Sequence, residues 1–481
     1  MRRLVLLLVP ALALAACAGH GGGDGPGDGG GSTLRATWVD RHGSGTLVRG
    51  PGEPFVRRTE LAPASRPVRQ LALFAQFTDA HVRDEESPAR VPFLDRFGSP
   101  FNSTFRPQEA LSPQVLAATV RSIDALHPQA VVETGDLIDN DQQNELTQAL
   151  QVLHGGVVDP NSGGPGYDGV QASADPDPLY YRPGVDSPSE PKLLATAERR
   201  FRSPGLDAPW YPVLGNHDVL AQGEVAPTPA IDSVAIGSRR VVQLPSGFSL
   251  PPGASAFARQ EVASLLAHGL PGRTAHVTAD PTRRLMPANE VVARLRAASR
   301  APGSGPLLRY SFDIGPSVRA IVLDTIDRVQ GSGGVLGAAQ VAWLADQLRA
   351  AGDRYVVVFS HQPLTSYPAG AAALALLDRD PHVVAAVAGD THRNRIVPRQ
   401  SPAGGYWMIT TSSLADYPQQ ARAFRLERTA NGHVVLETWM LDHDNGDLAG
   451  VSRELAYLDV QGGRPLRFAG RPRDRNALLY R

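Results

Sequence analysis

The sequence predicts an α/β fold in which buried strands alternate with helices. Short apolar runs of strand length recur along the chain, and a helix-like segment separates the first two of them, which is the order of a βαβ unit. Of the 481 residues 42% are hydrophobic, which is enough for a large core, and the length would hold roughly two or three average domains. We therefore expect a globular α/β protein.

The chain begins with the features of an export signal. Arg2 and Arg3 precede an apolar stretch from Leu4 to Ala16, and "LAAC" then ends at Cys17, the only cysteine. The stretch is shorter than the roughly 20 residues of a membrane-spanning helix and suits the core of a signal peptide. Because "LAAC" resembles a bacterial lipoprotein box, residues 1–17 are expected to be a lipoprotein-type signal peptide, with lipid attached to Cys17. The alternative is an ordinary secretory signal. We expect an extracytoplasmic lipoprotein of the bacterial cell membrane, secreted if there is no lipid anchor.

Residues 18–66 are expected to link this signal to the folded domain. The segment "AGHGGGDGPGDGGGS" is rich in Gly and Asp, a composition that cannot bury a core, and it predicts a flexible tether. "LRATWVD" and "TLV" around "RHGSG" predict a short hairpin, and a Pro-rich connector from Gly50 to Pro67 follows. With one cysteine, disulfides within the chain play no part in stability.

The core elements follow in order. The first core strand is expected at Leu71 to Phe77, and Ser112 is expected to cap a helix that runs to about Leu126, with Pro113 at its first position. "AVVE" from Ala130 predicts the next strand. Later in the chain "VRAIVLDT" predicts a strand, residues 337–351 predict a helix, and "AFRLERT" and "HVVLETWML" around Asn-Gly predict a hairpin.

Two long segments rich in Pro, Gly, Ser and Asp interrupt this pattern, at about 140–208 and 219–306. We interpret them as insertions in one domain of residues 67–445, because the polar motifs on either side need each other. Loops of this length are usually functional lids or poorly ordered. Residues 446–481 are expected to be a C-terminal extension.

Polar residues follow five apolar runs, each where the expected strand ends. In chain order they are Asp79 and His81, then Asp136 and Asp139, then Asn216, His217 and Asp218, then His361, and finally Asp390 and His392. The carboxyl ends of strands in such folds converge on one site. Composition excludes other classes: 47 basic and 48 acidic residues leave no nucleic-acid footprint in the net charge, and no G-x-S-x-G motif supports a serine hydrolase.

These residues resemble the motifs of the calcineurin-like metallophosphoesterases. The chain has D-x-H at Asp79, G-D-x-x-D from Gly135, G-N-H-D from Gly215, a strand-end His361, and G-x-x-H from Gly389, in the order of that family. "ESPARVPFLDRF", "FRPQEALS" and "DNDQQNEL" further resemble an exported bacterial subgroup. The resemblance implies a four-layer α/β/β/α sandwich of two mixed β-sheets with a dinuclear metal site at the strand ends.

Carried over residue by residue, the resemblance implies two sets of ligands. One metal would be held by Asp79, His81, Asp136 and His392, and the second by Asp136, Asn216, His361 and Asp390, with Asp136 as the bridge. Mixed oxygen and imidazole ligands suit Mn, Fe or Zn. The expected activity is hydrolysis of phosphate mono- or diesters, of small-molecule or nucleotide-like substrates, by a hydroxide that bridges the metals.

The resemblance also implies that His217 faces the leaving-group oxygen without binding metal, as a proton donor or charge stabiliser. Asp139 matches the residue that orients this histidine in related phosphatases. Asp218 is the alternative orienting carboxylate, but we favour Asp139 for that role and interpret Asp218 as loop structure. Arg83, Asn140 and Asn144 are candidate substrate contacts.

Asp390 departs from the family, most of which has histidine there. It would bind the second metal directly, reach it through water, or leave a one-metal site, and we favour direct ligation because the spacing to His392 is kept. The alternative to an enzyme is a catalytically weak metal-binding surface protein whose insertions bind a partner.

Overall fold

The computed structural model describes residues 28–98, 101, 103–245, 255–329, 331–444, 446–459 and 468–481. The expected signal peptide, the lipid site at Cys17 and the first part of the tether lie outside the described residues. Among the helices that are described, none is both long and apolar enough to cross a bilayer.

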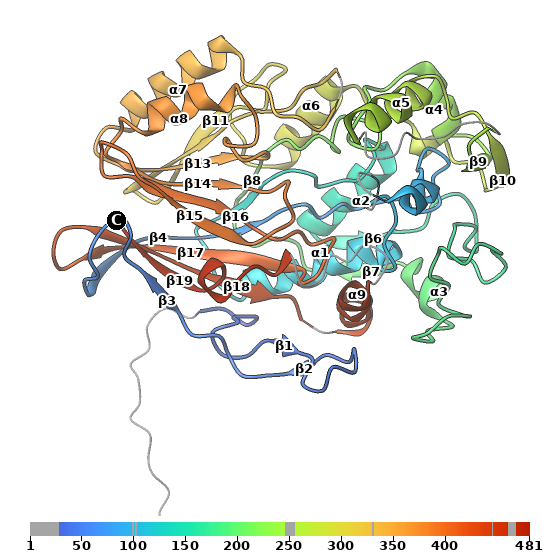
Figure 1. Cartoon of the computed structure of the whole chain (residues 1–481), viewed down its shortest axis with the longest axis horizontal. Helices are drawn as coiled ribbons and strands as arrows, with labels where there is room; N and C mark the ends of the chain where they lie inside the picture. The colour runs from blue at the N-terminus through green and yellow to red at the C-terminus, as the bar shows by residue number, and fades with distance from the viewer. Residues whose placement is uncertain are drawn as a thin grey trace, which may run out of the picture.

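Two mixed sheets form the centre of the molecule (Figure 1). The seven-stranded sheet has the order β3 (Val56–Arg58), β19 (Ala477–Tyr480), β18 (Val434–Asp442), β17 (Gln420–Thr429), β4 (Pro67–Phe77), β5 (Ala130–Glu133) and β8 (Trp210–Pro212). The six-stranded sheet has the order β11 (Tyr310–Ile314), β12 (Val318–Val322), β13 (Tyr355–Ser360), β14 (Val383–Ala388), β16 (Tyr406–Thr410) and β15 (Arg395–Arg399).

Helices cover the outer face of each sheet. Helix α1 (Ser112–Asp124) packs on β17 and β18, flanked by α2 (Gln143–His154) and α9 (Asp447–Leu458), while α7 (Ala338–Ala351) and α8 (Gly370–Leu377) cover the six-stranded sheet on the other side (Figure 1). The fold is therefore the expected four-layer α/β/β/α sandwich.

The largest apolar core lies between the two sheets. Phe74 of β4 stacks on Phe424 of β17 at 4.8 Å between ring centroids and meets Phe359 of the other sheet edge-on at 6.1 Å. All three rings are fully buried, and burying such apolar surface is the main favourable contribution to folding. Since both faces of β4 are covered, the run from Leu71 to Phe77 is buried at every position, which explains its lack of alternation.

Helix α1 confirms the predicted helix but not its predicted cap. Ser112 is the first helical residue, its hydroxyl makes no cap hydrogen bond, and it instead accepts a hydrogen bond from the backbone N–H of Arg83. A preceding turn of 3₁₀ helix, Glu109–Leu111, leads directly into α1. The serine is therefore used to hold a neighbouring loop near the site.

The two insertions are folded in their described parts, which contradicts the second of the two alternatives for loops of this length, functional lids or poorly ordered segments. The first contains α2, the ladder of β6 (Gly156–Val158) with β7 (Phe201–Ser203), and α3 (Leu193–Ala197). The second contains α4 (Pro229–Ala235), β9 (Arg239–Gln243), α5 (Ser255–Ala267), β10 (Arg273–His276) and α6 (Ala288–Ala298). Their apolar residues cluster with residues of the segment 89–111 and with Leu455, and these contacts stabilise the insertions against the domain.

Both ends of the described chain pack on the seven-stranded sheet. β1 (Trp38–Val39) and β2 (Val48–Arg49) form the predicted hairpin, and the connector supplies β3. The last residues of the Gly/Asp-rich segment are docked, because the Gly31 carbonyl accepts a hydrogen bond from Asp442 N and Ser32 is buried. The C-terminal extension supplies β19, which pairs with β18 and β3 inside the sheet.

Candidate metal centre

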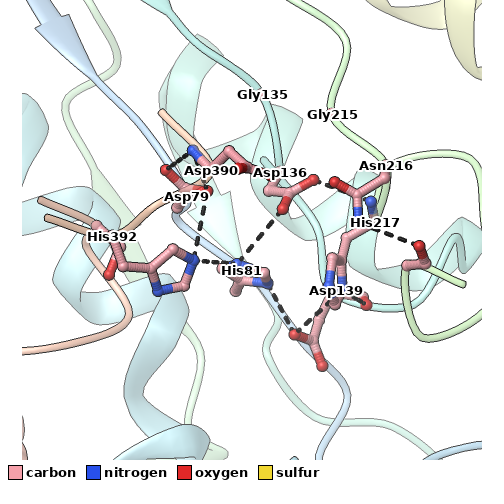
Figure 2. Close-up of polar contacts among 12 residues, drawn as sticks. Asp79, His81, Gly135, Asp136, Asp139, Gly215, Asn216, His217, Asp390 and His392 are labelled. Carbon is pink, nitrogen blue, oxygen red and sulfur yellow. Dashed lines mark hydrogen bonds and ion pairs between the residues drawn. The ribbon is translucent and has the colours of Figure 1, made fainter. Parts of the chain in front are cut away.

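The polar residues identified in the sequence meet at one edge of the two sheets. They follow the carboxyl ends of β4, β5, β8, β13 and β14, which are joined by parallel pairing within each sheet. Figure 2 shows side chains from the segments after β4, β5, β8 and β14 converging around His81. The strand-end argument therefore places the residues together, as expected for this kind of sheet.

The backbone at this edge is held in an unusual conformation. Asp79, His81, Asp136, Asp390 and His392 have φ of 51°, 44°, 55°, 63° and 54°, in the left-handed region that side chains other than glycine seldom adopt. Each such residue costs on the order of 1–3 kcal/mol and persists only where the surroundings enforce it. Here adjacent loops are hydrogen-bonded to each other: Asp79 N donates to the Gly135 carbonyl at 2.9 Å, and His81 N to that of Asp136 at 3.0 Å.

Three motif glycines leave room for this packing. A Cβ on Gly215 would lie 2.2 Å from Asp136 Oδ1, one on Gly135 would lie 2.5 Å from His361 Nδ1, and one on Gly389 would lie 2.0 Å from the Thr78 hydroxyl. Such approaches are too close for any other residue. The glycines therefore let the site side chains approach the neighbouring loops.

Asp79, His81 and His392 form a first group of facing ligand atoms. One ligand atom from each lies within 4.8 Å of the others. His81 Nε2 is 3.3 Å from His392 Nε2, and His392 Nε2 is 3.4 Å from Asp79 Oδ1 (Figure 2). Two imidazole nitrogens that face each other beside a carboxylate are a typical arrangement around a cation.

A second group contains Asp79, Asp136 and His361. His361 Nε2 lies 3.2 Å from Asp136 Oδ2, 3.2 Å from Asn216 Oδ1 and 3.8 Å from Asp390 Oδ1. Asp136 Oδ2 is also 3.7 Å from His81 Nε2, so this carboxylate lies between the two groups. The family resemblance implies a bridging ligand at this position.

The outer nitrogens of these rings are already bonded to the protein. His81 Nδ1 meets Asp139 Oδ1 at 2.9 Å, His361 Nδ1 meets the Thr134 carbonyl at 2.8 Å, and His392 Nδ1 meets Asp416 Oδ2 at 2.5 Å. Because an acceptor fixes the N–H on Nδ1, the lone pair of the neutral ring is on Nε2 and faces the centre. The Asn216 amide likewise donates to the Gly223 carbonyl and leaves its oxygen toward His361. The donor set therefore fits divalent metals.

The electrostatics of the centre match a cation site. Although burial opposes it, the charges of His361 and His217 hold the pKa of Asp136 well below its usual range. Burial alone would lower the pKa of His392, but Asp79 and Asp416 raise it to about 9. Burial raises the pKa of Asp390 to about 6, with the carboxylates of Asp79 and Asp136 adding to the shift. The crowded carboxylates would be relieved of repulsion by bound cations.

His217 and its expected partner are arranged differently from the prediction. His217 Nδ1 donates to the backbone carbonyl of Asp139 at 2.6 Å, whereas the Asp139 carboxylate is 3.9 Å away and bonds to His81 instead. Asp139 thus orients His217 through its main chain and His81 through its side chain. Asp218 accepts hydrogen bonds from the N–H groups of Gly215, Asp136 and Ile138, and so acts as loop structure.

The three candidate substrate contacts, Arg83, Asn140 and Asn144, bond to other residues of the protein. Arg83 is buried and lies 3.2 Å from Asp139 Oδ1, Asn144 donates to Asp84, and Asn140 accepts from Gln222 N at 2.6 Å. None of the three lines the cavity that opens on the site. Their prediction as substrate contacts is wrong because their polar atoms stabilise the loops beneath the site.

Sequence analysis missed two residues of the centre, Asp416 and Arg106. Asp416 follows β16, and besides His392 it accepts two hydrogen bonds from the Arg106 guanidinium, at 2.7 and 3.2 Å. Both line a cavity of about 440 Å³ that also contains His81, Asp136 and His217. The strand-end rule would have found Asp416 if "YWMIT" had been treated as a further strand.

A four-layer sandwich that gathers imidazole and carboxylate groups at its strand ends has the architecture of a metal-dependent hydrolase. The family model of the calcineurin-like phosphoesterases matches residues 73–394, which is 322 of the 481 residues. The chain belongs to the calcineurin-like phosphoesterase family. The five motifs from Asp79 to His392 all lie inside the matched range.

Solved structures give weaker similarities, and the curated proteins give none that is significant. A dimetal phosphatase from Danio rerio is 15% identical, with a TM-score of 0.39 over 78% of this chain and 100% of its own. The sulfate thiohydrolase SoxB of Thermus thermophilus, solved with glycerol, is 13% identical, with a TM-score of 0.31 over 82% of this chain and 61% of its own.

Proposed function

We propose that this protein hydrolyses phosphate mono- or diesters with two divalent metal ions. The observation that carries the proposal is the set of imidazole Nε2 atoms and carboxylate oxygens that face one another, each ring fixed by an acceptor behind it. Asp79, His81, Asp136 and His392 would hold one ion, and Asp136, Asn216, His361 and Asp390 the other. When bound, two such ions activate water and neutralise charge on a phosphate.

The residues outside this set would serve the leaving group. Hydrolysis joins a water oxygen to phosphorus and breaks the bond to the ester oxygen, which must take up a proton. The His217 ring is half-buried, lines the cavity and has its Nδ1 held by the Asp139 carbonyl, so a protonated ring donates from Nε2 into the cavity. His217 is therefore the proposed proton donor.

The test is hydrolysis of an aryl phosphate monoester and diester panel. Chelation should abolish activity and Mn, Fe or Zn should restore it, while Asp136→Ala should lose both metal and turnover. His217→Ala should bind two metals and lose roughly 10²–10⁴-fold in kcat, the range of a general acid. Full activity of metal-free Asp136→Ala protein would overturn the assignment. Two bound metals without any hydrolysis would favour the metal-binding surface protein instead.

We further propose that the protein acts outside the cytoplasm, anchored by lipid at Cys17. Support comes from the signal-like residues 2–16, the "LAAC" sequence and the Gly/Asp-rich segment after it. Wild-type protein expressed in a bacterium should partition with membranes and carry lipid mass at Cys17, and Cys17→Ser should do neither. A mature N-terminus elsewhere than residue 17 would contradict the anchor.

A further inference from the structure

The cavity over the metal centre is lined by candidate ligands and also by a cluster of apolar side chains. The members of this cluster that line the cavity are Val91, Leu94, Phe101, Val262, Ala263 and Leu266. The last three lie on α5 of the second insertion at spacings that put them on one helix face. We call these six residues the apolar wall.

The apolar wall packs against the loop that follows His217. Its apolar cluster includes Ala221 and Val225, which belong to the loop that continues from His217. Gln222 of the same loop also lines the cavity. Since His217 is the proposed donor to the leaving oxygen, the group attached to that oxygen would meet the wall. Figure 1 shows α4 and α5 lying together at this end of the molecule.

The cavity offers little to a second anionic group. Arg106 is the only arginine or lysine among the described residues that line it, and its three guanidinium nitrogens donate to Asp416 and the Ser103 carbonyl. Glu224 adds an acidic side chain to the lining. A nucleotide or polyphosphate would bring a second negatively charged group into the cavity. The only arginine in the described lining already bonds to other protein groups, and burying an unpaired charge is costly.

We infer that the apolar wall is a leaving-group subsite for apolar alcohols, so that the substrates are esters with a single phosphate group on an alkyl or aryl chain. The inference rests on the proposed function and narrows its substrate class. A cavity of about 440 Å³ lies in the size range of small-molecule sites and holds a phosphate with an extended chain.

A homologous series of propyl, pentyl and heptyl phosphates tests the subsite, in whichever ester type the protein hydrolyses. These alcohols have nearly equal basicity, so differences report binding and not leaving-group chemistry. kcat/KM should rise roughly fourfold per methylene until the wall is filled, which corresponds to about 0.8 kcal/mol per buried CH₂. Glycerol phosphate should be hydrolysed more slowly than propyl phosphate. A series without slope would overturn the inference.

Matched variants of α5 locate the effect. Ala263→Arg places a cation in the wall and should flatten the series, whereas Ser264→Arg adds the same charge on the exposed side of the helix and should leave it unchanged. Val262→Thr keeps the volume and should reduce the slope without unfolding, as melting curves would show. Equal slopes in Ala263→Arg and wild type would contradict the location.

Inhibition or binding by alkylphosphonates of the same lengths separates the two proposals. If affinity rises with chain length but no ester is hydrolysed, the proposed function fails and the subsite stands as a binding site. If esters are hydrolysed and neither series depends on chain length, the function stands and the subsite is wrong.

Discussion

At the scale of single residues, each imidazole among the candidate ligands is fixed by an acceptor behind it. The carboxylate of Asp416 holds His392 at Nδ1 and is itself held by Arg106. Such an outer carboxylate sets the ring orientation and increases the basicity of the facing nitrogen. Asp416 is thus a positioning residue, because it acts through His392.

Asp416→Asn should weaken metal binding by roughly 10–100-fold, the usual cost of losing such a partner. We expect activity to return at high metal concentration. The metal concentration that gives half of the maximal activity should rise, and kcat at saturating metal should change less. Asp378→Asn, which breaks the pair with Arg399 in β15, serves as the control and should leave the metal titration unchanged. Activity that excess metal cannot restore would argue against a positioning role.

Asp390 is the residue at which this chain departs from most of its family. Its Oδ1 is 3.8 Å from His361 Nε2, and its backbone N–H donates to the Asp79 carboxylate. The Asp390 carboxylate is therefore near the second group of ligand atoms, but among the described residues it is not a member of any of the groups whose ligand atoms all lie within 4.8 Å of one another. An aspartate is shorter than the histidine it replaces. Direct ligation therefore remains our prediction, and it requires the loop or the metal to move closer.

We expect Asp390→Ala to lose one metal equivalent and most activity, because an oxygen ligand of the second ion is removed. Asp390→His should keep two metals and shift preference toward zinc, since imidazole is a softer ligand than carboxylate. Elemental analysis of both variants measures the stoichiometry. Two tightly bound metals and normal turnover in Asp390→Ala would show that Asp390 is only a turn residue.

At the scale of elements, apolar runs and strand order predicted the strands that carry the site. β4, β5, β8, β13 and β14 all occur where apolar runs predicted them, because buried parallel strands need continuous apolar sequence. The insertions could not be predicted in this way. Their short helices and two-stranded ladders are stabilised by contacts between distant residues, such as Val91 with the α5 cluster, and local sequence does not encode such contacts.

The C-terminal strand shows the same limit. Residues 446–481 were expected to extend beyond the domain, yet β19 lies between β3 and β18 with Leu479 fully buried in the main core. A strand of four residues carries too little periodicity to be assigned to a sheet more than 400 residues away in sequence from its partner β3.

Leu479→Ala should therefore destabilise the whole domain by about 2–5 kcal/mol, the range for a truncated core leucine. Leu478→Ala is the matched control, because Leu478 is half-buried on the opposite face of β19 and should cost less. Urea unfolding followed by tryptophan fluorescence measures both. Equal, small effects would mean that β19 is peripheral to the cooperative unit.

At the scale of the whole molecule, the regions beneath the metal centre concentrate buried charge. Asp84 bonds to Asn144 and Ser162 of the first insertion and to Arg283 of the second, so it joins a strand-end loop to both insertions. Glu109 bonds to Arg90 nearby. No single motif predicts this network, since its members lie far apart in the sequence. Two further acids, the half-buried Glu85 and the buried Glu86, lie next to this network in the sequence.

Glu86 makes the free energy of unfolding depend on pH, and the sign of that dependence can be derived. Burial, with the neighbouring Glu85 carboxylate, raises the pKa of Glu86 to about 9, and its nearest arginine, Arg283, is 3.7 Å away and already bonded to Asp84. Below the unfolded value of 4.5 both states hold the proton, so the stabilisation is complete. Between 4.5 and about 9 the unfolded state loses the proton while the folded state keeps it, so stability falls as pH rises.

Glu86→Gln should remove this contribution, because the amide imitates the protonated acid and cannot ionise. Near pH 4 the variant and wild type should have nearly the same free energy of unfolding. From pH 5 to pH 8 that of the variant should exceed that of wild type by a steadily increasing amount, since this range lies below the folded-state pKa of about 9. Metal-free protein should be used, so that metal binding does not add its own pH dependence. Asp353→Asn, at an exposed position, removes one negative charge from the surface and should run parallel to wild type. A constant difference between Glu86→Gln and wild type across this range would show that Glu86 is ionised in the folded protein, paired with Arg283 despite its burial.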